Sequence, residues 1–346
     1  MRGFTVLLAC LFFMLPASAQ WQQQRQMSGT DVQLRGISAV SEKVAWASGA
    51  KGTVLRTIDG GEHWTKVEVP GAEALDFRDI QAFDWDTAFV LSIGPGEQSR
   101  IYKTTDGGKI WQRQFINSDP KAFYDCFAFW DSKHGIALSD SVDGKFPLIA
   151  TSDGATWAPV AVKSMPAALP NEGAFAASGT CIATYGKNDV WFGTGGPAAR
   201  VFHSSDRGMT WTVAETPIIH GEASQGIFSI VFRSHKEGAA VGGDYKQPDK
   251  VEATAAFTHD GGKTWQLARK QPSGYRSGLD TMLQSPGRFF AVGTNGMDRG
   301  SGESWRPMAQ GNFNAVSVGT LNVGWAVGPE GTIVRFYTVP QALRAH

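Results

Sequence analysis

Residues 257–265 read Phe-Thr-His-Asp-Gly-Gly-Lys-Thr-Trp, and versions of this stretch recur along the chain. Four full copies carry an aspartate, a glycine turn and a closing tryptophan, and a fifth copy is one residue shorter. A sixth copy, at 300–305, keeps Trp305 but has lost the aspartate. The aspartates and tryptophans of the first five are Asp59 and Trp64, Asp106 and Trp111, Asp153 and Trp157, Asp206 and Trp211, and Asp260 and Trp265.

The spacing of these tryptophans indicates the architecture, because they lie 47, 46, 54, 54 and 40 residues apart. A fixed motif at this period is typical of repeat proteins, and the range fits the blades of a propeller. In the first repeat, segments rich in β-branched and aromatic residues cover 34–40, 44–49, 53–57 and 64–69. Four-stranded units repeated around an axis form a β-propeller. We therefore predict an all-β fold consisting of a single propeller.

The number of blades follows from the inner strands, of which seven can be found, the last near 314–318. The last repeat ends without a box and without a fourth strand. Residues 21–29 align with 265–274 when one inserted residue is allowed. The N-terminal strand is thus expected to complete the last blade and close the ring, which hides the sheet edges. The prediction is a seven-bladed propeller of four-stranded blades over 20–338.

The repeated box is interpreted as structural, because a catalytic constellation is needed once and this motif occurs five or six times. Aspartate and hydroxyl side chains hydrogen-bond nearby backbone groups in turns, and glycine adopts φ values closed to other residues. A tryptophan buries a large surface between neighbouring sheets. The aspartates and tryptophans of the boxes are therefore predicted to build hairpin turns.

The ends of the chain and its cysteines bear on localisation. Arg2, an apolar run over 4–15 and the small residues 17–19 predict a signal peptide over 1–19, and 339–346 is read as a C-terminal tail. The apolar run is too short to span a bilayer, so we expect an exported protein, periplasmic or secreted, with no transmembrane segment in the mature chain. Cys126 and Cys181 either pair in an oxidising compartment or remain buried thiols.

The balance of charges and the lack of metal-binding motifs limit the classes of partner and cofactor that we expect. The chain has 32 basic and 32 acidic residues and no run of like charge, which argues against nucleic acid. No cysteine or histidine spacing suggests zinc, so neither a metal nor another cofactor is expected. A monomer is expected.

The boxes have the Asp-box, or BNR repeat, pattern, and Trp-Ala-x-Gly strands precede them at 46–49 and 325–328. With these motifs the chain resembles the single-propeller group that contains the photosystem II stability/assembly factors, across essentially the whole mature chain. The resemblance implies a non-catalytic, chaperone-like scaffold that binds another protein or a peptide. A fold of this kind hosts many activities, so the site has to decide the function.

Asp-boxes also occur in sialidases and xyloglucan-type glycoside hydrolases, so glycan binding or cleavage is the alternative function. A sialidase holds its substrate with three arginines, the first in an early Arg-Ile-Pro or Arg-Leu-Pro motif. Here the only Arg-Pro is Arg306-Pro307, late in the chain. Sialidases also have six blades, and xyloglucanases of this kind have two propellers. These differences count against hydrolysis.

The connections opposite the boxes vary in length, over 139–147, 159–173, 217–226 and 244–252, which is typical of a functional rim on a rigid scaffold. Aligned starts of the inner strands place Arg35, Arg78 and Arg276 at one position around the channel mouth, with Tyr124 and Phe228 between them. Arginine and tyrosine are favoured anchors in protein recognition. Further candidates on this face are Asp125, Glu172, Asp244 and Tyr245.

Two other interpretations of this face remain open. The arginines could pair with local acids such as Asp79 and serve only a polar channel. Two of the carboxylates Asp125, Asp140, Glu172 and Asp244 could form a catalytic acid pair, which requires that they meet at a definite separation. Convergence of the rim carboxylates in one small pocket would favour the enzyme, and a broad mouth would favour the scaffold.

Overall fold

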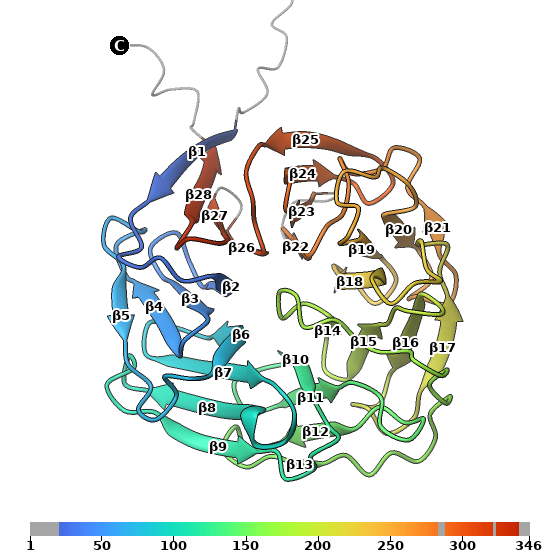
Figure 1. The fold of residues 1–346 in the computed structure, drawn as a ribbon, viewed down its shortest axis with the longest axis horizontal. Coiled ribbons are helices and arrows are strands. Elements are labelled where there is room, and N and C mark those ends of the chain that lie inside the picture. Colours follow the sequence, from blue (N-terminus) through green and yellow to red (C-terminus); the bar gives the residue numbers. More distant parts are fainter. Residues whose placement is uncertain (1–20, 283–287, 321–322, 339–346) are drawn as a thin grey trace, which may run out of the picture.

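The computed structural model describes residues 21–282, 288–320 and 323–338. Within these ranges, 28 strands form seven four-stranded antiparallel sheets, arranged as blades around a central axis (Figure 1). The predicted all-β, seven-bladed propeller is confirmed. The predicted signal peptide and the predicted C-terminal tail lie outside the described residues.

Each blade runs from an inner strand at the channel to an outer strand at the periphery of the disc. Blade 1 contains β2 (Leu34–Ala39), β3 (Ala45–Gly49), β4 (Thr53–Thr57) and β5 (Thr65–Val67). Blade 2 contains β6 (Asp76–Ala82), β7 (Thr87–Ile93), the short 3-10 helix η1 (Gly96–Gln98), β8 (Arg100–Thr105) and β9 (Gln112–Ile116). Blade 3 contains β10 (Tyr124–Phe129), β11 (Gly135–Ser139), β12 (Leu148–Thr151) and β13 (Ala158–Pro159).

The remaining blades follow the same order. Blade 4 contains β14 (Ile182–Tyr185), β15 (Asp189–Gly193), β16 (Arg200–Ser204) and β17 (Thr212–Glu215). Blade 5 contains β18 (Gln225–Phe232), β19 (Gly238–Asp244), β20 (Ala255–Thr258) and β21 (Gln266–Leu267). Blade 6 contains β22 (Gly278–Thr281), β23 (Phe289–Gly293), β24 (Gly296–Gly300) and β25 (Trp305–Ala309). Blade 7 contains β26 (Ala315–Thr320), β27 (Val323–Val327), β28 (Ile333–Thr338) and β1 (Trp21–Gln26).

The ring is closed by the N-terminal strand, as the sequence predicts. β1 pairs antiparallel with β28, from Trp21 opposite Thr338 to Gln26 opposite Ile333. Gln26 also joins blade 7 to blade 1. Its Oε1 accepts hydrogen bonds from the indole N–H groups of Trp64 and Trp325, both at 3.0 Å, and its Nε2 donates to the Gly60 carbonyl.

The aspartate of each box hydrogen-bonds within its own turn, and blade 5 shows the pattern. Asp260 Oδ1 accepts hydrogen bonds from the Thr258 hydroxyl and from the N–H groups of Lys263 and Thr264, and its Oδ2 accepts one from the Thr264 hydroxyl. Gly261 and Gly262 have φ values of +83° and +87°, where a side chain would be strained. The Asp260 carboxylate therefore uses its hydrogen-bonding capacity within its own turn.

The hydrophobic core lies between neighbouring blades. Trp46 and Val54 of blade 1, for example, pack with Ile80 and Val90 of blade 2. The box tryptophans join these layers: Trp64 packs where blades 7 and 1 meet, and Trp265 where blades 4 and 5 meet. No helix in the described part of the chain is both long and apolar enough to cross a membrane.

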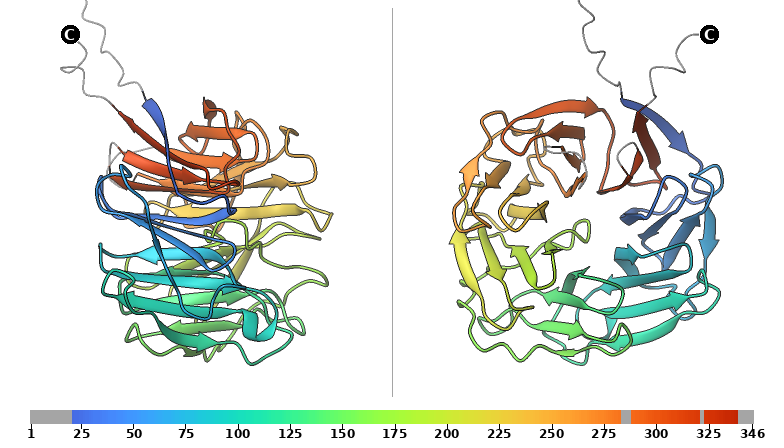
Figure 2. Two further views of the ribbon diagram at one scale, coloured as in Figure 1. Left: turned by 60° about the vertical axis from the view of Figure 1, so that its left-hand side comes forward. Right: turned by 180° about the vertical axis from the view of Figure 1, so that it is seen from behind.

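The long connections gather on one side of the disc. In the left view of Figure 2, loops of green to yellow colour extend beyond the blades on that side. Backbone hydrogen bonds join them: Ala168 donates to the Gly144 carbonyl, Ile219 to that of Ala253, and Tyr245 to that of Ser224. We call this side the loop-rich face and the opposite side, which carries the Asp-box turns, the box face.

Candidate functional site

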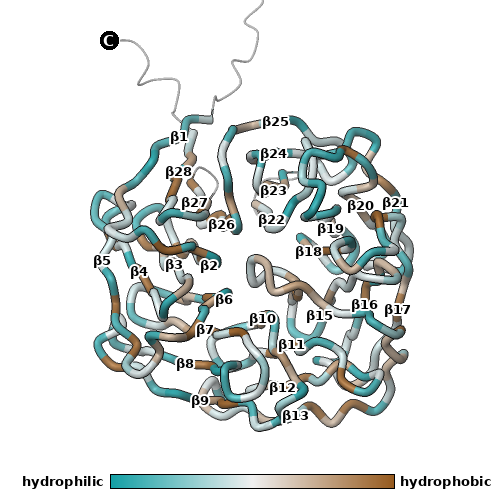
Figure 3. Tube along the Cα trace, in the orientation of Figure 1, coloured by the Kyte–Doolittle hydropathy of each residue, from teal (hydrophilic) through white to brown (hydrophobic). Residues whose placement is uncertain are grey.

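The channel is crossed at the loop-rich face by residues 173–181, which precede β14 and which we call the plug. Figure 1 shows this green segment reaching the centre of the ring, and Figure 3 colours much of it white to brown. The Ser178 hydroxyl donates to the Ser277 carbonyl in blade 6 at 2.7 Å. Arg78 of blade 2 donates to the Ala176 carbonyl at 2.7 Å. The plug is thus tied to blades on both sides of the channel.

The sequence left open whether the two cysteines pair or remain free thiols, and the structure shows them paired. Cys126 of β10 and Cys181 at the end of the plug form a disulfide, with their Cα atoms 6.1 Å apart. Both residues are fully buried. The bond therefore ties the plug to blade 3.

Above the plug, side chains from four blades surround the channel mouth, and we call Arg35, Arg78, Phe228, Tyr245 and Tyr275 the rim cluster. Arg35, Arg78 and Phe228 each sit at a bulge where their inner strand shifts register. A bulge turns a side chain away from the regular alternation of a strand. The same local irregularity therefore aims all three toward the mouth.

Arg35 is the least satisfied member of the rim cluster. Its Nε is buried and has no hydrogen-bond partner among the described residues. Burial, and next the neighbouring charge of Arg78, lower the pKa of Arg35 to about 10, although Asp76 and Tyr275 oppose this shift. The group stays cationic at neutral pH, so a partly buried positive charge carries one buried N–H that has no acceptor within the described residues.

Arg78 is held more firmly. Its Nε forms an ion pair with Asp76 Oδ2 at 2.9 Å, and one terminal nitrogen binds the plug. The hypothesis that rim arginines pair with local acids is therefore correct for Arg78, with Asp76 as the partner. Asp79, the acid expected in that role, instead accepts the Phe127 N–H at 2.8 Å.

The aromatic side of the mouth is continuous. Phe175 of the plug stacks on Phe228 with ring centroids 3.8 Å apart, and Tyr275 meets Phe228 edge-on at 4.8 Å. Tyr245 approaches Phe228 at 6.1 Å and is 47% exposed. Tyr275 is almost fully buried, and burial first of all raises the pKa of its hydroxyl. The mouth thus combines two guanidinium groups with an aromatic wall.

Arg276 is not at the mouth, which corrects the sequence alignment. Its N–H donates to the Gly242 carbonyl of the preceding blade, as the N–H of Leu34 donates to the carbonyl of Gly328. Arg276 therefore occupies the position of Leu34, and Ser277 that of Arg35. The alignment was displaced by one residue, so the side chain turns inward. It is 0% exposed and forms a buried ion pair with Asp298.

Two further candidates, Tyr124 and Glu172, are also internal. Tyr124 is 5% exposed and packs edge-on against Phe115, at 5.2 Å, and burial raises its pKa to about 12. Glu172 is paired with Arg200 and accepts the Thr194 hydroxyl, so it anchors its own loop.

Asp244 and Asp125 differ in the hydrogen-bond partners of their carboxylate groups. Asp244 accepts the N–H of Lys246 at 2.9 Å within its own turn, and it stays ionised because this and other hydrogen bonds outweigh burial and lower its pKa. Asp125 is 1% exposed, and its Oδ2 has no partner among the described residues. Burial, and next the charge of Asp140, raise the pKa of Asp125 well above its usual range.

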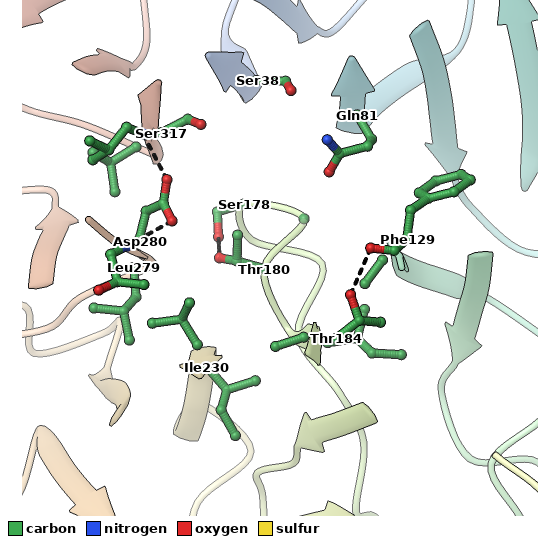
Figure 4. Close-up of a pocket in the computed structure, with 18 of the residues that line it drawn as sticks. Ser38, Gln81, Phe129, Ser178, Thr180, Thr184, Ile230, Leu279, Asp280 and Ser317 are labelled. Carbon is green, nitrogen blue, oxygen red and sulfur yellow. Dashed lines mark hydrogen bonds between the residues drawn. The ribbon is translucent and has the colours of Figure 1, made fainter. Parts of the chain in front are cut away.

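A central cavity of about 590 Å³ lies below the plug, toward the box face. Figure 4 shows that its wall is built from inner strands, with Ser38, Gln81, Asp280 and Ser317 around it and Ser178 of the plug beside them. Burial raises the pKa of Asp280 to about 6 and that of Asp79 well above its usual range.

The polar groups of this cavity are accounted for by the fold. Asp280 accepts the N–H of Val318 in the next blade at 2.7 Å, and Ser317 accepts that of Ala39 at 3.1 Å. Inner strands are sheet edges, and their free N–H groups need acceptors. The side chains of one blade therefore satisfy the backbone of the next.

One group of possible metal ligands occurs among the described residues, in the box turn of blade 1. Donor atoms of Asp59, Glu62 and His63 lie within 4.8 Å of one another. Asp59 already accepts the His63 N–H and the Thr57 hydroxyl, as the other box aspartates accept theirs. The turn explains this group without a metal.

Sequence reasoning missed Phe175 and the place of Tyr275. The plug is irregular and comes before β14, so its contacts across the channel leave no periodic signal. The place of Tyr275 follows from the hydrogen bond of the Arg276 N–H to the Gly242 carbonyl, which only the tertiary structure shows.

Comparisons with known proteins agree with this architecture. The family model described as photosynthesis system II assembly factor YCF48 matches residues 14–121. The chain is a BNR-type propeller similar to the photosystem II assembly factors. The curated photosystem II assembly protein Ycf48 of Synechococcus sp. (strain JA-2-3B'a(2-13)) is 23% identical, and the match covers 81% of this chain and 85% of that protein. Its counterpart in Synechococcus sp. (strain JA-3-3Ab) is 25% identical over 85% of this chain and 91% of that protein.

Solved structures of similar fold include YCF48 bound to D1 peptide, with a TM-score of 0.64 and 13% identity over 92% of this chain and 97% of that one. YCF48 from Cyanidioschyzon merolae has a TM-score of 0.59 and 17% identity, and covers 92% of this chain and 99% of that one. At these identities the likeness extends to the fold.

Proposed function

We propose that this protein is an exported, non-catalytic scaffold that binds a protein or peptide segment across the rim cluster on its loop-rich face. The observation that carries the proposal is Arg35, a partly buried cation whose buried Nε lacks an acceptor among the described residues. Buried polar groups are nearly always satisfied. A carboxylate of a bound segment, from a side chain or a chain end, would supply the missing acceptor.

The chemistry of the rim cluster defines the partner. Arginine binds carboxylates with two parallel hydrogen bonds, and the exposed Tyr245 side chain, which packs against the buried Phe228, offers an apolar surface beside it. An acidic residue next to an aliphatic or aromatic one fits this arrangement. The similar propeller that binds a D1 peptide supports a peptide rather than a small molecule.

The glycan alternative has less support. Glu172 is committed to Arg200 and Asp244 to its turn, and Asp125 is fully buried. Glycosidic cleavage needs two accessible carboxyl groups flanking the bond. The mouth instead presents arginine and aromatic side chains around a plugged channel.

The test begins with capture from an envelope extract of the source cells on the mature protein, followed by binding measurements with the captured protein or its peptides. Arg35→Ala combined with Arg78→Ala should weaken binding about 10- to 100-fold, because hydrogen bonds to charged groups contribute about 1.5–3 kcal/mol each. Arg113→Ala is the matched control, since Arg113 is an exposed arginine on β9, at the outer edge of blade 2.

A partner that binds the double variant as tightly as the wild type would remove the rim cluster from consideration. Arg276→Ala is unsuitable as a probe because it would leave Asp298 buried and unpaired. Export is tested separately by fractionation, and a mature chain beginning at Gln20 would support it.

A further inference from the structure

The sixth box, on the box face of blade 6, departs from the others. In blade 5, Thr258 to Trp265 spans eight residues, whereas Gly300 to Trp305 spans six and has no aspartate. Gly300 is paired directly with Trp305 across this tight turn. The carboxylate that neutralises and organises the other turns is therefore missing here.

Two arginines face each other immediately below this turn. Arg299 of β24 lies directly opposite Arg306 of β25 in the antiparallel pair. Side chains of directly opposite residues lie on the same side of the sheet, within about 4.5–5.5 Å at Cβ, and like charges in such pairs are destabilising. The fold therefore tolerates an unfavourable pair at this position.

In other blades, the cation at the position equivalent to Arg299 has different neighbours and hydrogen-bond acceptors. In blade 1 the cation is Arg56, which faces Thr65 and donates to the Trp85 carbonyl at 2.9 Å. In blade 2, Lys103 faces Gln112 and donates to the Gly154 carbonyl. Each of these cations has a neutral neighbour and a carbonyl acceptor from the next blade. Arg299 has neither within the described ranges.

Two more cations join the pair. Arg288, which immediately precedes β23, and Lys270, which follows the outer strand of blade 5, line the same cavity of about 400 Å³ with Arg299 and Arg306. Burial, and next Arg306 and Arg288, lower the pKa of Arg299. Ser301 and Ser304 belong to the same lining.

Nearby acidic residues do not neutralise these four cations. Glu303 is paired with Arg269 and with His259, and Asp298 is committed to Arg276 on the buried side of the sheet. In the part of the chain that the structure describes, Lys270, Arg288, Arg299 and Arg306 form no ion pair. Four like charges around one cavity, with hydroxyl donors beside them, describe the complement of a multivalent anion.

We propose that the blade 6 box turn is a binding site for a phosphate- or sulfate-class oxyanion, held by Arg299 and Arg306 with Lys270, Arg288 and the two serines around it. The anion takes the place of the missing box carboxylate and relieves the Arg299–Arg306 repulsion. This site lies on the box face, so it is independent of the peptide surface proposed above.

The test measures thermal unfolding in chloride and in inorganic phosphate at equal ionic strength. Phosphate at 10 mM should raise the Tm of the wild type by about 2–4 °C, as expected when an anion binds only the native state. Arg306→Gln should raise the Tm in chloride, because it removes the like-charge pair, and should abolish most of the phosphate response. Arg113→Gln, the same change on the outer strand of blade 2, should alter neither.

Titration calorimetry with inorganic phosphate provides the second measurement. Arg299→Gln combined with Arg306→Gln should weaken binding at least about tenfold. Absence of a phosphate response in the wild type, or its persistence in this double variant, would overturn the proposal. Persistence would show that the anion acts elsewhere.

A third arm identifies the source of the anion. Sedimentation with phosphatidylglycerol vesicles, compared with phosphatidylcholine vesicles, tests a lipid phosphate. Binding of free phosphate together with vesicle binding that the double variant loses supports the site and makes a lipid headgroup its source. Binding of free phosphate alone supports the site with a soluble phosphate as its ligand.

Discussion

Single residues of the same type serve different purposes in this protein, and backbone register decides which. Arg35 sits at a bulge and turns toward the channel mouth, whereas Arg276 sits one position earlier in its blade and turns into the core. A shift of one residue moves a side chain to the other face of a strand. The sequence contains both arginines in similar contexts, so their difference is visible only in the structure.

At the same scale, the box aspartates should make stability depend on acid. Burial works to raise the pKa of Asp260, but hydrogen bonds from Thr264, Thr258 and the Lys263 N–H outweigh it and hold the pKa at about 2. Because the folded pKa is depressed, the stabilisation is present above about pH 4 and is lost as the pH falls through 2. Asp260→Asn should cost about 1 kcal/mol at pH 6 and almost nothing near pH 2.

Urea unfolding between pH 2 and pH 6 measures this difference. Asp31→Asn serves as the control, because Asp31 is exposed and makes no hydrogen bond within the described residues. A constant gap between wild type and Asp260→Asn across this range would contradict the assigned role of the carboxylate.

At the scale of elements, the plug departs from the repeat. The blade 4 inner strand β14 begins only at Ile182, after the chain has crossed the channel, while β18 in blade 5 runs for eight residues. Gly179, with a φ of +80°, leaves no room for a side chain beside the Asp79 carboxylate. Small residues and a left-handed turn let the plug pass close to the channel wall.

The disulfide should stabilise this element. Cys126 and Cys181 are 55 residues apart in sequence. Cross-linking a loop of this length lowers the entropy of the unfolded chain, which stabilises the folded protein by about 2–4 kcal/mol. A reductant should therefore lower the urea midpoint of the wild type. In the Cys126→Ala/Cys181→Ala double variant the midpoint should already be low and should not respond to reductant. An unchanged wild-type midpoint would mean that the two thiols are free in solution.

At the scale of the whole molecule, stability depends on closing the ring. The first strand of the described chain and the last meet in blade 7, and Gln26 connects that blade to Gly60 and Trp64 of blade 1. An open ring would expose two sheet edges and one face of the core. The closing contacts therefore join the two ends of the repeat array into one cooperative unit.

Gln26→Ala tests this closure. The change leaves the indole N–H groups of Trp64 and Trp325 buried without an acceptor, so we expect a loss of about 2–4 kcal/mol. Differential scanning calorimetry should show a lower Tm and, if the ring opens first, a broader transition. Gln24→Ala, an exposed position on the same strand, should leave the Tm within about a degree. Equal effects of the two changes would argue against closure as the weak point.

The sequence by itself determined the blade count, the strands, the structural nature of the boxes and the closing N-terminal strand. These features repeat or follow from local turn chemistry, and a pattern present in several copies can be recognised without coordinates. The first repeat illustrates this, since its third strand was predicted at 53–57 and is observed at Thr53–Thr57.

The tertiary structure alone decided which side chains meet between segments that are distant in the sequence. It brought Phe175 onto Phe228, joined Cys126 to Cys181, buried Arg276 with Asp298, and set Arg299 against Arg306. Each of these pairs depends on a one-residue bulge, an irregular crossing or a shortened turn. These departures lie outside the repeated sequence motif, and their consequences appear only when the blades are packed around the axis.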